Sequence, residues 1–243
     1  CVFLRRHGRR LQRFTRFCQT IALRHNTLRA DMFRCLIYGI LVDELDTLRA
    51  EDQVEFYIGT SGYNYKGWKG HFYPEKFADK DMLDFYGQHF KSVEINNSFY
   101  RVPKPDMVKA WADQAPEQFR FSMKATRRIT HQKRLKNVAE ETEYFEGIAS
   151  NLGDRLGAVL FQLPPYLKKE MDRLQVFVEQ LPEGMPAAME FRHDSWFDNE
   201  VRDCLNSRNI ALYFSHEDED TAADVERRFA STASWGYLRL RGT

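Results

Sequence analysis

The sequence has few cysteines and no long apolar run, and both absences limit what the protein can be. Its 243 residues include four cysteines, Cys1, Cys18, Cys35 and Cys204, which form neither a CxxC pair nor a metal-type spacing. We therefore expect a chain of the reducing cytosol rather than a disulfide scaffold. Because no stretch reaches the roughly 20 apolar residues that cross a bilayer, we expect no membrane partner.

Motifs for a nucleotide cofactor or a catalytic metal are also missing. The glycine-containing turn GTSG at residues 59–62 is too short for a P-loop or a dinucleotide-binding loop. Glu94, Glu190, His131 and His193 are residue types that bind metals, but no HxH or HExxH spacing occurs. The sequence thus predicts no cofactor and no metal.

Acidic residues are absent from the first thirty positions, and charge is unevenly divided along the chain. Residues 1–50 contain ten Arg, no Lys and four acidic residues, whereas residues 51–243 carry 26 basic and 31 acidic side chains. An Arg-rich, acid-poor leader is typical of a transit peptide, and an extended gene model or a poorly ordered arm is the alternative. We expect residues 1–55 to form a helical or poorly ordered N-terminal extension and residues 56–243 to form the domain.

From Phe56 onward, short β-rich segments alternate with amphipathic helical ones. This order is typical of βαβ units and therefore of an α/β fold with a parallel sheet. Between the strands, Pro105 suits the first turn of one helix, and Asn137 with Glu140 matches the capping pattern of another. Strands that are apolar first and charged at their ends favour a barrel whose mouth carries the site. The predicted strands are residues 56–60, 92–96, 120–124, 157–162, 187–191, 210–214 and 236–240.

Polar side chains follow the apolar cores of most predicted strands. Residues two apart in a strand face the same side, so Glu94 points the same way as Asn96, and Glu190 the same way as Arg192. In a barrel that side is the interior, where only the top layer meets solvent. The candidate catalytic residues are Glu94, Glu190 and His193. The candidate ligand-binding residues are Asn96, Tyr100, Lys124, His131, Gln162, Arg192, Trp196 and Arg239.

Three cations and two carboxylates at one mouth predict a site for a small anionic ligand, such as a phosphate or a sugar phosphate. Lys124, Arg192 and Arg239 would hold the anion, since Arg can bind two oxygens at once. In a hydrolase or lyase, Glu94 or Glu190 would be the general base and His193 would transfer a proton. The alternative is a salt-bridge network that only closes the top of the barrel.

Three other functions are alternatives to this anion-binding enzyme. A glycoside hydrolase would pair Glu94 with Glu190, but the surrounding cations oppose the raised carboxyl pKa that its acid needs. Nucleic-acid processing would use a basic loop at residues 124–136 and an aromatic run at residues 63–73 that stacks bases, although residues 51–243 are acidic overall. The third function is a ligand-binding or partner-docking module without turnover.

Seven motifs occur in the order of a known family: FYIGTSGY (56–63), GWKGHFYP (67–74), VEINNSFYR (93–101), ITH (129–131), LGAVLFQLPP (156–165), MEFRHDSW (189–196) and YLRLRG (237–242). Over residues 56–243 the chain resembles the YecE-like family, domain of unknown function 72. The resemblance implies a TIM-barrel-like (β/α) barrel and no established reaction. Seven of its eight strands are present, so we expect an open edge between the first and last strands. Arg241 stands where the family usually has His, which weakens a His-dependent role there.

Overall fold

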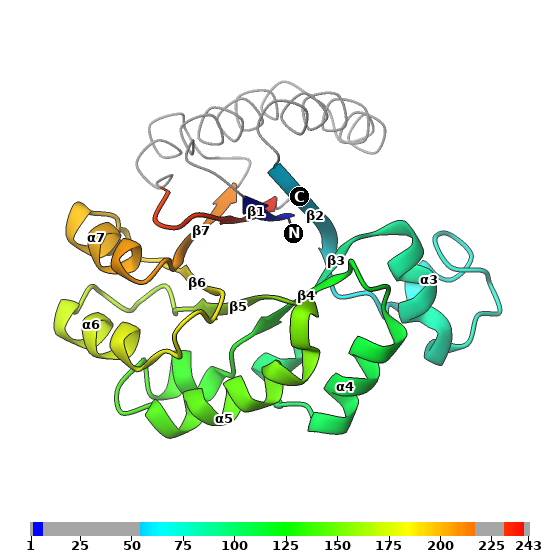
Figure 1. Cartoon of the computed structure of the whole chain (residues 1–243), viewed down its shortest axis with the longest axis horizontal. Coiled ribbons are helices and arrows are strands. Elements are labelled where there is room, and N and C mark those ends of the chain that lie inside the picture. Colours follow the sequence, from blue (N-terminus) through cyan, green and yellow to red (C-terminus); the bar gives the residue numbers. More distant parts are fainter. Residues whose placement is uncertain (1, 7–53, 217–230, 241–243) are drawn as a thin grey trace.

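The computed structural model describes residues 2–6, 54–216 and 231–240 (Figure 1). Its centre is a curled sheet of seven parallel strands that neighbour one another in chain order. This arrangement confirms the predicted α/β fold, and each strand starts within two residues of its predicted start. The strands are β2 (Val54–Ser61), β3 (Ser92–Ile95), β4 (Arg120–Lys124), β5 (Leu156–Gln162), β6 (Ala187–Glu190), β7 (Ala211–His216) and β8 (Gly236–Leu240).

Helices connect the strands and cover the outer face of the curled sheet (Figure 1). They are α3 (Met82–His89), α4 (Pro105–Gln114), α5 (Ala139–Ala149), α6 (Met171–Gln180) and α7 (Asn199–Ser207). Each buries an apolar face, as α6 does with Leu174, Phe177 and Val178. Within the described ranges, no helix combines the length and the apolar character needed to cross a membrane.

The two predicted helix starts have different outcomes. Pro105 opens α4, as predicted, because Pro lacks the N–H that the first turn of a helix leaves unbonded. In α5, by contrast, the N-cap position belongs to Val138, and no side chain caps the helix. Asn137 instead takes a left-handed backbone with φ of 53°, a conformation that Asn tolerates better than most residues. The predicted Asn137 cap is therefore wrong.

Strand alternation divides the apolar side chains between the two faces of the sheet. Outward residues such as Met189 join helix residues such as Phe177 in the larger core. Inward residues, among them Leu160, Ala188 and Tyr237, form a second core on the concave side, and none of its described members belongs to α3–α7. Polar groups on the concave side are consequently placed at the ends of the strands.

A further strand, β1 (Val2–Arg6), pairs with both edges of the curled sheet. It runs antiparallel to β2, with Leu4 opposite Phe56, and antiparallel to β8, with Leu4 opposite Gly236. The ring of paired strands is closed, so the predicted open edge is wrong. Unpaired N–H and C=O groups at a sheet edge accept many extended segments, so patterning alone could not identify this one. Of the helical or poorly ordered extension predicted over residues 1–55, residues 2–6 and 54–55 are instead strand residues of β1 and β2. The rest of it, residues 1 and 7–53, lies outside the described residues and stays a prediction.

Candidate functional site

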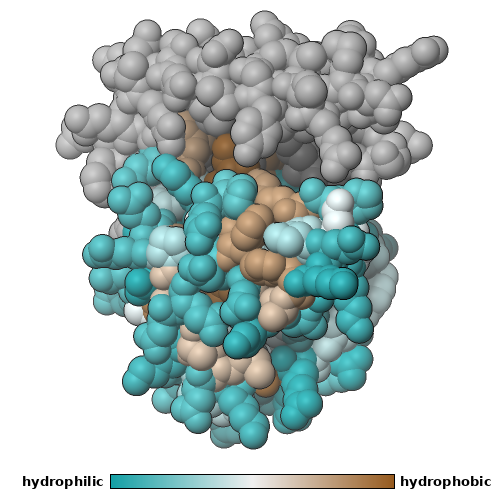
Figure 2. All heavy atoms as spheres, turned by 90° about the vertical axis from the view of Figure 1, so that its right-hand side faces the viewer, coloured by the Kyte–Doolittle hydropathy of each residue, from teal (hydrophilic) through white to brown (hydrophobic). Residues whose placement is uncertain are grey.

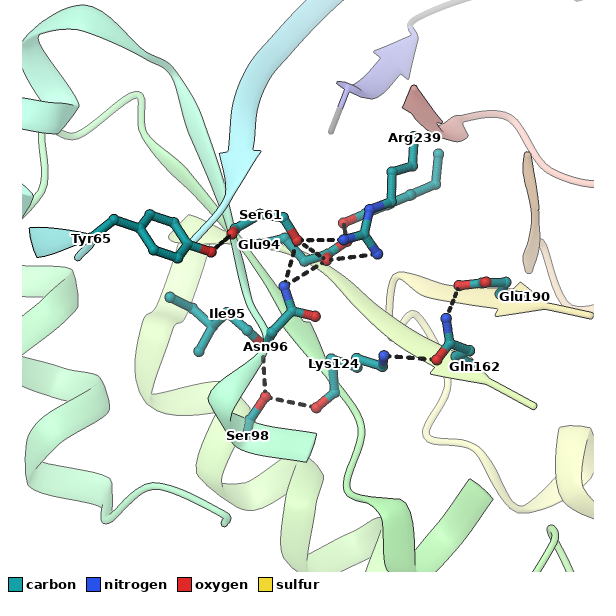
Figure 3. A network of polar contacts seen from close by, with 11 residues as sticks. Ser61, Tyr65, Glu94, Ile95, Asn96, Ser98, Lys124, Gln162, Glu190 and Arg239 are labelled. Carbon is teal, nitrogen blue, oxygen red and sulfur yellow. Dashed lines mark hydrogen bonds and ion pairs between the residues drawn. The ribbon is translucent and has the colours of Figure 1, made fainter. Parts of the chain in front are cut away.

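Polar side chains meet at the carboxyl ends of the parallel strands, above the concave apolar core (Figure 3). On β5 the inward position after Leu160 is Gln162, and on β6 the inward position after Ala188 is Glu190. The same alternation places charged side chains from β3, β4 and β8 at this end. The predicted residues joined here by hydrogen bonds or ion pairs are Glu94, Asn96, Lys124, Gln162, Glu190 and Arg239.

Glu94 is a fully enclosed charge, with 0% of the residue exposed. Its Oε1 accepts 2.9 Å hydrogen bonds from Ser61 Oγ and Asn96 Nδ2, and its Oε2 accepts one of 2.8 Å from the Tyr237 hydroxyl. Burial by itself would raise the pKa of Glu94, but the charge of Arg239 and the three donors outweigh burial and lower that pKa. Glu94 is therefore an ionised carboxylate at neutral pH.

Arg239 is the counterion of Glu94. Its Nη1 lies 3.5 Å from Oε1 of Glu94, and its Nη2 donates a 2.7 Å hydrogen bond to Ser61 Oγ. The hydroxyl of Tyr65, from the loop after β2, donates to the backbone carbonyl of Ser61 (Figure 3). The guanidinium of Arg239 is thus already bonded to groups of the protein.

A second line of polar groups runs through Lys124, Gln162 and Glu190 (Figure 3). Lys124 Nζ donates a 2.8 Å hydrogen bond to Gln162 Oε1, and Gln162 Nε2 donates one of 2.7 Å to Glu190 Oε2. Gln162 is 7% exposed and Glu190 is 2% exposed. The two ends of the amide thus meet groups of opposite charge, which fixes its orientation and separates the cation from the carboxylate.

Basic side chains gather around Phe99, which follows β3. Lys124 Nζ lies 4.5 Å from the centroid of the Phe99 ring, and the His131 ring meets that ring edge-on with centroids 4.9 Å apart. Burial, followed by the charges of Lys124 and Arg192, lowers the pKa of His131. Burial also lowers the pKa of Lys124, against the attraction of the two carboxylates nearby. Lys124, His131 and Arg192 therefore form one electrostatic group.

The sequence of the chain matches one family over most of its length. The description of that family is "protein of unknown function DUF72", and the match covers residues 57–243. The chain belongs to the DUF72 family. This finding confirms the resemblance inferred from the seven motifs.

Curated relatives of this DUF72 chain come from two bacteria. UPF0759 protein YunF of Bacillus subtilis (strain 168) is 33% identical over 151 residues, which are 58% of this chain and 52% of that protein. UPF0759 protein YecE of Escherichia coli (strain K12) is 34% identical over 116 residues, which are 47% of this chain and 43% of that protein. The chain spans about half the length of these relatives.

Solved structures of DUF72 proteins share the fold. A DUF72 family protein from Thermotoga maritima MSB8 (TM1631) is 30% identical, with a TM-score of 0.58 over 65% of this chain and 64% of that one. A DUF72 family protein from Enterococcus faecalis V583 (EF0366) is 22% identical, with a TM-score of 0.53 over 64% of this chain and 58% of that one. The second likeness supports the fold alone. Neither name states a ligand or a reaction, so the function of this DUF72 chain is argued from its geometry.

Trp196 of the DUF72 chain lies in the outer core rather than among the charged groups. It is 1% exposed and stacks on Phe191 with centroids 4.7 Å apart. Its indole N–H donates a 2.7 Å hydrogen bond to the Leu167 carbonyl. A turn after β6 carries the ring back against the helices, so Trp196 has almost no surface for a ligand in this structure.

His193, Arg192 and Tyr100 lie in the loops that follow β6 and β3. His193 Nδ1 accepts a 3.1 Å hydrogen bond from the Ser195 backbone N–H and caps the short helical turn that follows. Tyr100 is 70% exposed, and its ring meets Phe99 edge-on at 5.0 Å. Arg192 is exposed and forms no hydrogen bond or ion pair with another described residue. Arg192 is thus the cation of this group that the described protein leaves unneutralised.

Sequence reasoning missed three residues that complete the site. Tyr237 stands two positions before Arg239 on β8, so the alternation rule could have placed both on the concave side. Ser61 directly follows the predicted strand 56–60. Polar side chains were expected at the ends of the other strands, so the same rule could have included Ser61. Phe99 carried no signal, because an aromatic residue after a strand is more often a packing residue.

The aromatic run at residues 63–73 packs onto itself and onto α3. Phe72 meets Tyr73 with centroids 4.8 Å apart and Phe85 of α3 at 5.5 Å. Tyr73 is 2% exposed, and its hydroxyl donates a 2.6 Å hydrogen bond to the Tyr63 carbonyl. Figure 2 shows the side of the molecule that carries α3, where apolar side chains lie in a band bordered by hydrophilic ones. Tyr73 is therefore unavailable for stacking on bases, whereas Tyr65 of the same run is 45% exposed.

A cavity of about 800 Å³ lies at the opposite end of the sheet, by the amino ends of β5 to β8. Two of its polar side chains bind the protein: Arg208 Nη2 donates a 2.8 Å hydrogen bond to the Leu181 carbonyl, and Asn209 Oδ1 accepts one of 2.7 Å from the Ser234 N–H. Ligands of parallel α/β folds bind at the carboxyl ends of the strands. We therefore place the candidate site at the charged end rather than in this cavity.

The described residues of the site can bind a ligand through charged groups and hydrogen bonds. Among residues 2–6, 54–216 and 231–240, no three His, Cys, Asp or Glu side chains are grouped so that they could hold a metal ion. The carboxylates present are engaged by the protein, Glu94 by Tyr237 and Asn96, and Glu190 by Gln162.

Proposed function

We propose that this chain binds a small anionic ligand, such as a phosphate or a sugar phosphate, at the carboxyl ends of its parallel strands. The observation that carries the proposal is the group of basic side chains around Phe99. Lys124 and His131 contact the same phenyl ring, and the charge of Arg192 acts on both of them. An anion among these groups would be attracted more strongly than in bulk water, because partial burial lowers the local dielectric.

The position of the ligand follows from the type of fold that we propose. A TIM-barrel-like fold binds its ligands at the carboxyl ends of the strands, on the loops that follow them. Phe99, His131 and Arg192 lie on three such loops, after β3, β4 and β6. In this proposal β1, although antiparallel, occupies the position at which an eighth strand would close the barrel.

The cations of the site have different roles in the proposal. Arg192 binds the anion through its guanidinium fork, which matches two oxygens of a phosphate or carboxylate. Lys124 adds a single charged donor that the rigid end of β4 holds in place. Arg239 acts on the ligand indirectly, because it already binds Glu94 and Ser61.

In an enzyme of this design, Glu190 would be the general base, with Gln162 orienting its carboxylate. Glu94 suits this role less well, because Arg239 and three hydrogen bonds stabilise its ionised form. For the same reason Glu94 is a poor candidate for the raised-pKa acid of a glycoside hydrolase. His193 would transfer a proton only after it leaves the turn that it caps.

The basic loop after β4 favours a small ligand over nucleic acid. Arg128 Nε and Lys133 Nζ lie 2.8 Å and 2.7 Å from the same oxygen of Glu141, and their hydrogen bonds lower the pKa of Glu141 to about 2. Two of the cations that a nucleic acid would need are thus paired within the protein. Nucleic-acid binding and a non-catalytic ligand-binding role are the alternatives to be distinguished by experiment.

The proposal is tested by calorimetric titration of the chain with inorganic phosphate and glycerol 3-phosphate at low salt. We expect Arg192→Ala to abolish binding and Lys124→Arg, which keeps the positive charge, to retain it. Arg155→Ala is the matched control. Arg155 lies just before β5, at the other end of the sheet, and its Nε donates a hydrogen bond to the Pro116 carbonyl. Equal affinity in wild type and Arg192→Ala, or no binding by wild type, would overturn the proposal.

We also propose a reducing, cytosolic location, based on the spacing of the cysteines. Cys204 is a free thiol, and burial raises its pKa, which keeps it in the unreactive protonated form. Fractionation of cells that produce the natural protein tests this location directly.

A further inference from the structure

We propose that Lys124 is a nucleophile that forms an imine with an aldehyde or ketone group of the ligand. This inference rests on the proposed function, because it concerns the same site and names the class of ligand: a small carbonyl compound that also carries an anionic group. Three features of Lys124 support it, namely its hydrogen-bond partner, its anchoring and its surroundings.

The hydrogen-bond partner of Lys124 is a neutral amide. Within the described part of the chain its Nζ donates to Gln162 Oε1 at 2.8 Å and forms no ion pair. Other lysines of the protein differ in this respect: Lys69 pairs with Asp79 at 2.7 Å, and Lys169 pairs with Asp198 and with Glu200. Lys124 can therefore lose its proton without breaking an ion pair, whereas Lys169 cannot.

Gln162 links the Lys124 amine to Glu190. Because the Gln162 Nε2 donates to Glu190 Oε2 at 2.7 Å, the amide stands between carboxylate and lysine. A carboxylate in direct contact would hold the ammonium form and suppress nucleophilic attack. The Glu190 carboxylate is thus separated from the Lys124 amine by the Gln162 side chain alone. It is close enough to accept a proton once the amine has reacted.

The backbone around Lys124 is fixed, so the amine has a defined position. Ser98 Oγ donates a 2.7 Å hydrogen bond to the Lys124 carbonyl and a 2.9 Å hydrogen bond to the Ile95 carbonyl, which ties β4 to the end of β3 (Figure 3). The next residue, Ala125, donates its N–H to the Leu160 carbonyl at 2.8 Å. A nucleophile on a rigid strand end is positioned for attack more reliably than one on a loop.

The surroundings of Lys124 increase the share of the neutral amine that can react. Burial lowers the pKa of Lys124, so more of the amine is deprotonated at a given pH than for an exposed lysine, while the Phe99 ring and the two carboxylates favour the ammonium form that binds an anion. Its titration also responds to the charged groups that face it, which are Glu94 on β3, Glu190 on β6, Arg192 after β6, Arg239 on β8 and His131 after β4.

The reaction is balanced without a further reactant. The neutral Lys124 amine attacks the carbonyl carbon, a C–N bond forms, and the carbonyl π electrons move to oxygen, which takes up one proton released by the nitrogen. The C–O bond of the resulting carbinolamine then breaks, the oxygen leaves as water with the second proton from nitrogen, and the imine remains. The net change is one amine and one carbonyl converted to one imine and one water.

The test is reductive trapping on the full chain. The protein is incubated with glyceraldehyde 3-phosphate or, as the matched neutral probe, glyceraldehyde; borohydride then reduces any imine to a stable amine. Peptide mass spectrometry measures the label at each lysine. We expect label concentrated at Lys124, more with the phosphorylated probe, complete loss of that label in Lys124→Arg, and no change at Lys124 in Lys169→Arg.

The outcomes separate this inference from the proposed function. Phosphate binding to wild type and to Lys124→Arg, with label spread over surface lysines and none enriched at Lys124, would overturn the imine and leave the anion site standing. Label at Lys124 that is equal for both probes, with no phosphate binding, would support the nucleophile and overturn the anion site. Circular dichroism of Lys124→Arg shows whether a lost label reflects unfolding, and label in wild type at a different lysine also overturns the inference.

Discussion

Tyr237 and Glu94 are 143 residues apart in the chain, yet the Tyr237 hydroxyl donates a 2.8 Å hydrogen bond to Oε2 of Glu94. β8 and β3 are not paired with each other, because β1 and β2 lie between them in the ring of strands. The bond therefore crosses the concave side of the sheet. The enclosed carboxylate on β3 depends on the last described strand for a donor and, through Arg239, for its counterion.

Replacement of Tyr237 by Phe should destabilise the fold. Tyr237→Phe removes one donor from a fully buried carboxylate, and the expected loss is about 1–3 kcal/mol of unfolding free energy. Urea denaturation at neutral pH measures it. Tyr144→Phe is the control, since Tyr144 is 62% exposed and should change little. An equal effect of both substitutions would contradict the importance of the Tyr237–Glu94 bond.

The stability of the fold should depend on the ionisation of Glu94. Its pKa in the folded protein lies below the ordinary value of 4.5. Ionised Glu94 therefore stabilises the fold above that ordinary value, and the contribution is lost as pH falls through the lower, folded-state pKa. Other shifted carboxylates contribute as well, so the measurement is the difference in unfolding free energy between wild type and Glu94→Gln across pH. We expect that difference to shrink in acid, and a constant difference would refute this account.

Trp196 should affect stability and leave ligand binding unchanged. Trp196→Phe removes the hydrogen bond to the Leu167 carbonyl and part of a buried ring, at a cost of about 1–3 kcal/mol or somewhat more if a cavity remains. Phosphate affinity per folded molecule should match that of wild type in calorimetry. A selective loss of affinity with unchanged stability would instead support the predicted ligand-binding role of Trp196.

Lys124 and Gln162 should be energetically coupled. A double-mutant cycle with Lys124→Met and Gln162→Met should give an interaction energy of about 0.5–3 kcal/mol in urea denaturation, because the residues share a hydrogen bond. Lys69→Met replaces Lys124→Met in the control cycle, since Lys69 pairs with Asp79 instead. There the effects should add to within about 0.5 kcal/mol. Additivity in both cycles would argue against the polar line through Gln162.

Much of the site was accessible from local pattern. A strand has a period of two residues, so a polar residue that follows Leu160 or Ala188 by two positions must face the concave side once the strand is recognised. This rule placed Gln162 and Glu190, and it would also have placed Tyr237 beside Arg239. Local pattern failed for the Asn137 cap, because a left-handed turn has no periodic signal. It also did not predict the packing of Trp196 on Phe191, because the return of a loop onto the core has no periodic signal either.

The sequence by itself determined the order of strands and helices, the parallel sheet and the charged residues at the strand ends, since each follows from periodicity and chain order. Only the tertiary structure decided which charges meet: Arg239 binds Glu94, whereas Lys124 reaches Glu190 only through Gln162. Those distances depend on strand register and curvature, which hydrophobic periodicity does not specify. The pairing of β1 with both sheet edges is also visible only in the tertiary structure. Strand pairing at an edge uses backbone N–H and C=O groups, so the side-chain pattern does not identify the partner.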